Sequence, residues 1–253
     1  MCFRLDNQVA VITGASGGIG RAVAFALAES GAEVFLHANR RPEVALSAVR
    51  LIQKKGGKAS LLTADLSVPE KQEAFVQGVL SMYPSVDHWI NAAGIDLMSE
   101  TNRNLSFEEK LERLWAVDLL AAVRMSKKIG QKMKQAGKGT ILFFGWDGVE
   151  RGMTGDTAEL YGAVKGAVQG FTKSLAQSLA PEVRVNCIAP GWIATTWGEK
   201  ASPSMKERGT KESLMNRWGC PDDIAAAAAF LVSDAASYIN GQCLPINGGF
   251  RVA

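Results

Sequence analysis

The sequence predicts a doubly wound α/β fold, in which helices cover both faces of one parallel sheet. Short, continuously apolar runs alternate with longer amphipathic stretches, and no repeat, linker or low-complexity tract interrupts this alternation. Strands this apolar are buried on both faces, which is typical of a parallel sheet with right-handed helical crossovers. The chain has 253 residues and is 47% hydrophobic, so we expect one three-layer α/β/α domain over residues 1–253.

The elements follow one another in a regular order. Val9–Thr13 is a compact apolar run that predicts the first strand, and the helix after it should end at Gly31. Ser106 is expected to cap a long helix that carries two glutamates in its first turn. Further strands are predicted at 34–37, 59–63, 86–91, 140–145, 183–189 and 243–246. Helices are predicted at 20–30, 42–55, 69–82, 106–135, 157–180 and 221–233.

Residues 191–217 form the one long stretch that is predicted to be irregular. Such a stretch in a compact domain is usually functional, so we expect a mobile lid over a substrate. Large apolar side chains in it could line an apolar pocket or anchor the loop by packing; they are Trp192, Trp197 and Met205.

Charge and cysteine spacing exclude several classes of protein. The net charge of +3, from 28 basic and 25 acidic residues, gives no reason to expect nucleic-acid binding. The four cysteines form no CxxC pair, so we expect neither a metal site nor a disulfide framework, and the thiols fit a reducing compartment. No signal peptide or membrane span is visible, which predicts a cytoplasmic protein. Five lysines between Lys127 and Lys138 are expected to be a solvated helix face, with a patch for an anionic partner as the alternative.

A glycine-rich loop lies where the first strand turns into the first helix. It reads Thr13-Gly14-Ala15-Ser16-Gly17-Gly18-Ile19-Gly20. Glycines allow a tight turn and a close approach to a pyrophosphate, and the helix N-terminus adds free N–H groups and positive potential. The context therefore predicts a Rossmann-type dinucleotide site. Its contacts would include Gly14, Ser16, Gly18, Ile19 and Gly20.

The end of the second strand indicates which dinucleotide binds. NAD sites place an acidic residue there to hold the ribose 2′-hydroxyl, but this chain reads His37-Ala38-Asn39-Arg40-Arg41. A 2′-phosphate would meet Arg40 or Arg41 beside Asn39, so NADP(H) is favoured over NAD(H). The alternative is that both arginines merely begin a solvated helix. Asp65, after the third strand, could accept a hydrogen bond from the adenine amino group or cap the turn before Pro69.

Tyr161 and Lys165 lie four residues apart on a predicted helix and therefore share a face. A nearby ammonium is expected to lower the pKa of the phenol and bring it closer to acid/base work near neutrality. Lys165 could also hold the hydroxyls of the nicotinamide ribose.

The order of motifs resembles the short-chain dehydrogenase/reductase family over the whole chain, and within it the 3-oxoacyl-carrier-protein reductase branch. The motifs are the glycine loop, Asp65-Leu66, Asn91-Ala92-Ala93-Gly94, Tyr161 to Lys165, Asn186 with Pro190-Gly191, Arg217 to Ala225, and Gly241-Gln242 with Asn247-Gly248-Gly249. The resemblance implies hydride transfer between NADP(H) and a carbonyl or alcohol. It also implies that Tyr161 exchanges the proton and that Lys165 relays it.

The resemblance assigns further roles. Asn91 would steady the sheet beside the cofactor, which Leu66, Ala92 and Gly94 would also contact. Contacts with the nicotinamide would come from Pro190, Gly191, Ile193 and Thr195. A homotetramer or homodimer would form through the Tyr161 helix and the 106–135 helix. The candidate interface residues, for each of which the chain's own core is the alternative, are Ala167, Val168, Phe171 and Leu175.

The chain departs from the family at the position of the catalytic serine. No serine occurs from Lys127 to Leu160. Counting from the fifth strand places Trp146 at this position, and counting back from Tyr161 places Gly148 there. A protonated Asp147 could donate the hydrogen bond that the serine gives to a substrate oxygen. The alternatives are Thr154 as the donor, or a structural Asp147 with catalysis weakened or lost.

Three questions stay open on the sequence. Asp118 stands where the family usually has asparagine in a mid-helix kink, and its role could be functional or merely tolerated. Loss of the serine leaves a catalytically impaired NADP(H)-binding protein, acting as a sensor or partner subunit, as the alternative to an enzyme. The substrate could be an acyl thioester, sugar, steroid, pterin or small ketone. Gln177 and Glu182 give no basic patch for an acidic carrier protein.

Overall fold

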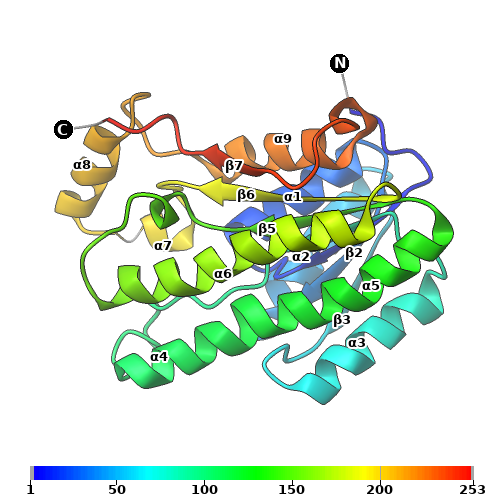
Figure 1. Cartoon of the computed structure of the whole chain (residues 1–253), viewed down its shortest axis with the longest axis horizontal. Coiled ribbons are helices and arrows are strands. Elements are labelled where there is room, and N and C mark those ends of the chain that lie inside the picture. The colour runs from blue at the N-terminus through cyan, green and yellow to red at the C-terminus, as the bar shows by residue number, and fades with distance from the viewer. Residues whose placement is uncertain (1–2, 200, 252–253) are drawn as a thin grey trace.

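Seven parallel strands form one sheet in the order β3-β2-β1-β4-β5-β6-β7 in a computed structural model that describes residues 3–199 and 201–251 (Figure 1). The strands are β1 (Val9–Thr13), β2 (Glu33–Ala38), β3 (Ala59–Thr63), β4 (His88–Asn91), β5 (Gly139–Phe144), β6 (Val183–Pro190) and β7 (Cys243–Ile246). This confirms the predicted doubly wound sheet. Chain order reverses between β1 and β4, and the crevice at the carboxyl ends of these strands is where open α/β sheets bind dinucleotides.

Helices cover both faces of the sheet (Figure 1). They are α1 (Gly18–Glu29), α2 (Pro42–Lys54), α3 (Pro69–Met82), α4 (Phe107–Leu114), α5 (Ala122–Ala136), α6 (Asp156–Leu179), α7 (Thr196–Glu199), α8 (Pro203–Glu212) and α9 (Pro221–Val232). Helices α1, α2 and α9 pack on one face, and α3, α5 and α6 pack on the other. Alternate strand residues fill the two cores: Val11 and Trp89 face α3 and α5, whereas Ile12 and Ile90 face α1 and α9.

The helix predicted at 106–135 is interrupted by a wide turn at Asp118, where the resemblance to the family implies a kink. Ser106 caps it as expected, because its hydroxyl accepts from the backbone N–H of Glu109 at 3.2 Å. Between α4 and α5, however, the backbone forms a π-helical segment, Trp115–Ala121, which includes Asp118. Such π-bulges are frequent at functional sites.

The prediction that residues 191–217 are irregular is wrong, because α7 and α8 lie within them. Ser202 caps α8 by accepting from the N–H of Met205 at 3.3 Å, and Pro203 occupies the first turn. Most of α8 is exposed, and Gly209 is its one buried residue. A helix with so little buried surface has no apolar stripe for sequence periodicity to detect.

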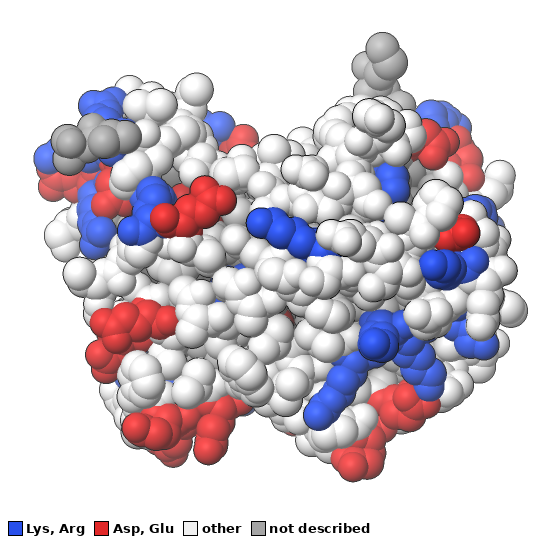
Figure 2. Space-filling model, viewed as in Figure 1, with Lys and Arg blue, Asp and Glu red and all other residues white. Residues whose placement is uncertain are grey.

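Charges on the α5 side of the molecule are mixed. Figure 2 shows a group of basic side chains over α5 beside acidic ones. Lys128 of α5 pairs with Glu73 of α3, and Lys134 donates to the carbonyl of Ser178 at 2.9 Å. These contacts fit a solvated helix face. Within the described ranges, no helix is long and apolar enough to cross a membrane, and no cluster of three or more acidic, histidine or cysteine side chains could hold a metal ion.

Candidate active site

The glycine loop is closely packed at the carboxyl end of β1. Gly14 has a positive φ of 70°, and a Cβ there would lie 2.5 Å from the carbonyl oxygen of Ala92. A Cβ on Gly20 would lie 2.5 Å from the oxygen of Gly14. Gly17 caps α1 without a side-chain hydrogen bond, so the first N–H groups of the helix point out of the loop. This cradle fits an anionic pyrophosphate.

Two arginines stand exposed after β2, where a ribose phosphate would reach. Asn39, Arg40 and Arg41 are all exposed. Arg40 lies near enough to Asp65 to help lower the pKa of that carboxyl, although the hydrogen bond from the Ser67 hydroxyl is the largest cause. Asp65 Oδ1 accepts from the N–H and hydroxyl of Ser67 at 3.0 and 2.7 Å. Asp65 therefore has the turn-capping role that the sequence left open. The side chains of Arg40 and Arg41 are exposed on the same surface.

Asn91, the last residue of β4, joins the sheet to α5. Its amide nitrogen donates to the hydroxyl of Ser126 at 2.9 Å, and its oxygen accepts from the indole N–H of Trp89 at 3.1 Å. Next to it, the Thr13 hydroxyl accepts from the N–H of Ala93 at 3.1 Å. These bonds fix the backbone beside Ala92, against which the glycine loop packs. No local sequence signal points to Ser126, because its partner Asn91 lies 35 residues away.

Tyr161, Lys165 and Asp118 come together at the carboxyl end of the sheet. Lys165 Nζ lies 2.9 Å from Asp118 Oδ1, and these side chains are only 13% and 1% exposed. Asp118 Oδ2 accepts from the backbone N–H of Ile95 at 2.9 Å. The Tyr161 hydroxyl donates to the carbonyl of the same Ile95 at 2.6 Å. The π-helical segment, the loop after β4 and α6 thus meet in one polar cluster.

The prediction that Lys165 lowers the pKa of the Tyr161 phenol is wrong for this structure. Burial raises the pKa of Tyr161 well above its ordinary value, and the negative charge of Asp118 adds to the effect. A smaller opposing contribution comes from the backbone of Leu97, and Asp96 acts in the same direction as Asp118. Burial is the main cause of the reversal, and the pairing of Lys165 with Asp118 adds to it because the carboxylate offsets the charge of the ammonium.

Asp147 faces the C-terminal segment of the chain. Its Oδ2 accepts from Arg151 Nη2 at 2.6 Å and from the amide of Asn247 at 3.1 Å. The guanidinium of Arg151 lies 3.4 Å above the ring of Phe250. The geometry favours the structural role for Asp147 among the alternatives, since the oxygen serves as an acceptor. Thr154 is exposed in the turn before α6.

Trp146 occupies the space that counting from β5 assigns to the serine. Its ring and that of Tyr161 are 6.4 Å apart between centroids and inclined at 54°. The indole covers Gly148, where a Cβ would lie 2.3 Å from Cζ2. The wall beside the phenol is therefore aromatic.

The segment after β6 reaches back to the glycine loop. Pro190 ends β6, and the N–H of Gly191 donates to the carbonyl of Ile246 at 3.2 Å. Ile193 is buried. The Thr195 side chain lies 3.1 Å from where a Cβ on Gly18 would be. The four residues predicted to contact the nicotinamide thus lie between β7 and the start of α1.

Trp192 anchors α8, which supports the packing alternative for this side chain. Its indole N–H donates to Glu212 Oε2 at 2.8 Å, and its ring lies 5.2 Å from that of Trp218. Trp218 in turn donates to the carbonyl of Lys206 at 2.9 Å. Met205 is partly buried, and the side chain of Trp197 lies outside the described residues.

Two of the predicted interface residues belong to the chain's own core. Val168 and Leu175 are buried beneath α6, so the intramolecular alternative holds for both. Ala167 and Phe171 are partly buried, and the Phe171 ring packs edge-on against Phe143.

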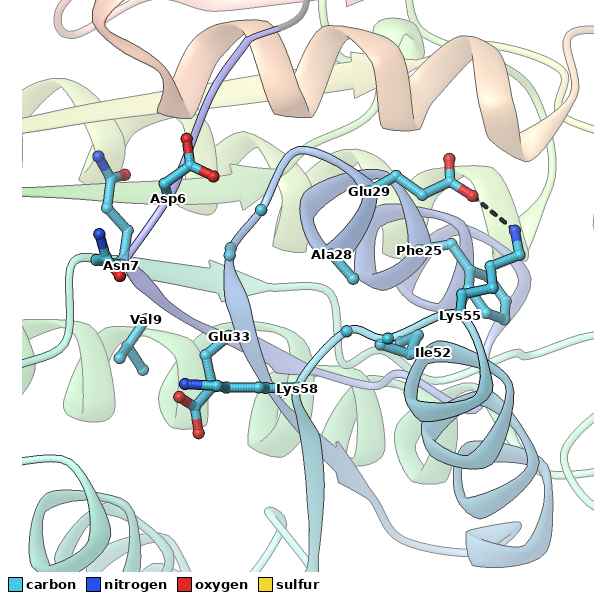
Figure 3. A pocket seen from close by; sticks show the side chains of 15 residues that line it. Asp6, Asn7, Val9, Phe25, Ala28, Glu29, Glu33, Ile52, Lys55 and Lys58 are labelled. Atoms are coloured by element: carbon cyan, nitrogen blue, oxygen red, sulfur yellow. Dashed lines mark hydrogen bonds and ion pairs between the residues drawn. The ribbon is translucent and has the colours of Figure 1, made fainter.

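A hollow of about 700 Å³ lies at the opposite end of the sheet (Figure 3). It opens at the amino ends of β1, β2 and β3, next to Val9, Glu33 and Lys58. The Lys55 ammonium and Glu29 carboxylate pair across part of its rim at 2.8 Å. None of the predicted site residues lines this hollow, so it is separate from the candidate active site.

Comparisons with known proteins agree with this geometry. A family model described as Enoyl-(Acyl carrier protein) reductase matches residues 14–251. The 3-oxoacyl-acyl-carrier-protein reductase FabG of Chlamydia muridarum is 34% identical over 246 residues, 97% of this chain and 98% of the relative. A 3-oxoacyl (acyl-carrier-protein) reductase of Agrobacterium tumefaciens, solved with NADP bound, has a TM-score of 0.88 at 28% identity, covering 98% of this chain and 96% of that one. A 7α-hydroxysteroid dehydrogenase solved with NADH and a 7-oxo bile acid has a TM-score of 0.86 at 28% identity and the same coverage.

Proposed function

Because the chain belongs to the short-chain dehydrogenase/reductase family and is an oxidoreductase, we propose that it reduces a carbonyl to an alcohol, or the reverse, with Tyr161 as the group that exchanges the proton. One observation carries this proposal. A buried phenol and a lysine ammonium, one helical turn apart on α6, lie at the carboxyl edge of the sheet together with the glycine cradle. The named relatives are reductases and dehydrogenases, which does not favour the impaired binding protein.

NADP(H) is the cofactor that the residues favour. When bound, it would supply or accept the hydride at its nicotinamide ring. The N-terminus of α1 would hold the pyrophosphate, and Asn39 with Arg40 or Arg41 would hold the 2′-phosphate. Nicotinamide contacts would come from Pro190, Gly191, Ile193 and Thr195. Relatives are solved with NADP and with NADH, so the exposed arginines are the basis for this preference. Faster turnover with NADH than with NADPH would contradict it.

Tyr161 would be the principal donor to the substrate oxygen. It would release the carbonyl of Ile95, to which it now donates, and turn to the substrate. Lys165 would hold the ribose hydroxyls and return a proton to the phenol. Asp147, held by Arg151 and Asn247, would fix the C-terminal segment beside the substrate site. Helices α7 and α8 would form the lid.

Acyl thioesters are the first substrate class to test, because 3-oxoacyl-carrier-protein reductases are among the relatives. We also propose a homotetramer or homodimer through α5 and α6, with Ala167 and Phe171 at the contact. The free thiols of the described cysteines support a reducing, cytoplasmic location.

The direct test is NADPH oxidation over a panel of carbonyl compounds, starting with 3-oxoacyl thioesters. Tyr161→Phe should abolish turnover, because it removes only the exchangeable proton, and should leave the dissociation constant for NADPH unchanged. Lys165→Met serves as the comparison, since it should weaken cofactor binding as well. Undiminished turnover by Tyr161→Phe would refute the role of the phenol.

A further inference from the structure

A chain of polar contacts runs from the phenol of Tyr161 through Ile95 and Asp118 to the ammonium of Lys165. The Tyr161 hydroxyl donates to the Ile95 carbonyl, and the Ile95 N–H donates to Asp118 Oδ2. Asp118 Oδ1 pairs with Lys165 at 2.9 Å, and Lys165 lies one helical turn after Tyr161. Both oxygens of the carboxylate are therefore engaged, one by the N–H of the residue whose carbonyl contacts the phenol and the other by the ammonium.

The charge on Asp118 matters because the pair is buried. The carboxylate is 1% exposed and the ammonium 13%, so little water screens either charge. An uncompensated ammonium one turn from Tyr161 would stabilise a phenolate, whereas the pair has no net charge. The ion pair with Asp118 also holds the Lys165 side chain next to the phenol.

We propose that Asp118 is a positioning residue that cancels the charge of Lys165 and thereby keeps Tyr161 as a protonated hydrogen-bond donor throughout the neutral range, so that the site is fitted to receive a carbonyl oxygen. This inference rests on the proposed function. In the reduction, hydride forms the new C–H bond, the carbonyl π bond breaks, and the proton leaves the Tyr161 oxygen to form the alcohol O–H. Lys165 then returns a proton to the phenolate. Asp118 does not change the equilibrium between carbonyl and alcohol. Its effect is therefore expected in the pH dependence of the rates of both reduction and oxidation.

The other titratable groups near this cluster come from several elements. Asp96, in the loop after β4, also acts on the phenol, and its Oδ1 accepts from the N–H of Met98 at 2.9 Å. Lys165 lies near enough to Cys187 of β6 to oppose part of the rise in the pKa of its thiol. Asp147, in the turn before α6, is paired with Arg151. Asp118 is distinguished from all of these because it contacts the ammonium directly.

The test compares Asp118→Asn with Asp96→Asn. Both substitutions remove one negative charge near Tyr161 and nearly preserve shape, but only the first removes the partner of Lys165. An asparagine at position 118 can still accept from the Ile95 N–H, so the loop contact survives. The chain has 3 tyrosines, and the ultraviolet difference spectrum of their ionisation can be followed against pH. Subtracting the titration of Tyr161→Phe identifies the contribution of Tyr161.

Asp118→Asn should shift the Tyr161 titration to lower pH by about one unit or more, and Asp96→Asn should shift it less. The decline in kcat/KM for carbonyl reduction at alkaline pH should move down by the same amount, with the folded fraction checked by thermal unfolding. If Asp118→Asn does not fold, Asp118→Ser is the substitute, since it also removes the charge with a smaller polar side chain. An unchanged titration of Tyr161 would overturn the inference. The titration does not depend on turnover, so an active Tyr161→Phe would refute the proposed function while leaving this result interpretable.

Discussion

Gly14→Ala is the sharpest single perturbation of the proposed cofactor site. Gly14 has a φ of 70°, a conformation that costs an L-residue roughly 1–2 kcal/mol. The added Cβ would also lie 2.5 Å from the Ala92 oxygen and 2.6 Å from the Ala93 Cα, both of them backbone atoms. Overpacking of this kind typically costs about 1–3 kcal/mol. The free energy of unfolding should therefore fall by about 2–5 kcal/mol, the sum of these two costs.

Urea unfolding measures this loss, and NADPH fluorescence measures its effect on binding. Relief of the clash must displace the glycine loop from Ala92, so affinity for NADPH should fall together with stability. Gly17→Ala is the matched control in the same loop. Its φ is −81°, and a Cβ there would meet only the Gly14 oxygen at 3.3 Å. It should change stability by less than about 1 kcal/mol. Equal stability and equal NADPH affinity for Gly14→Ala and the parent protein would refute the reasoning.

Substitutions at two further positions test other parts of the molecule. Asp147→Ala should lower the free energy of unfolding by about 1–3 kcal/mol, because Arg151 loses a charge-assisted hydrogen bond. Asp147→Ser should recover little of that loss or of turnover, and full turnover by the serine form would instead support a donor role at this position. Burial lowers the pKa of His88 to about 4 from 6.5, so the unfolded chain binds the proton more readily. Stability is then complete above about pH 6.5 and falls by about 3 kcal/mol as the pH decreases to about 4. Urea unfolding across this range should show a flatter dependence for His88→Gln, and an identical dependence would contradict the assignment to His88.

Local chemistry explains which features the sequence could predict. The strands are apolar throughout because both faces are buried, and they alternate with amphipathic helices at a spacing that a parallel sheet requires. The glycine loop is likewise local, since the turn, the close approach and the helix start all lie within eight residues. The serine's absence could also be read directly, because it depends only on counting from β5 and from Tyr161.

The remaining features depend on contacts between distant segments. Asp147 meets Asn247 across 100 residues, so its acceptor role has no local signal. The expected pKa shift of Tyr161 had the wrong sign because the spacing of Tyr161 and Lys165 reveals neither burial nor the position of Asp118. Helix α8 was missed because its stability comes from a serine cap and from contact with Trp192 and Trp218, rather than from an apolar stripe.

Three consecutive residues in the loop after β5, Trp146, Asp147 and Gly148, form one packed arrangement. Trp146 packs its indole on Gly148, and any larger residue at 148 would collide with the ring, since a Cβ would lie 2.3–2.5 Å from three of its atoms. The two positions that counting assigns to the serine therefore pack against each other: Trp146 supplies the ring, and Gly148 leaves space for it. Asp147, which lies between them, accepts hydrogen bonds from Arg151 and Asn247 and so holds the loop against the C-terminal segment. Because the wall beside the phenol is aromatic, we expect Tyr161 to be the main donor that polarises a substrate carbonyl, and such a site needs a donor that stays protonated at neutral pH.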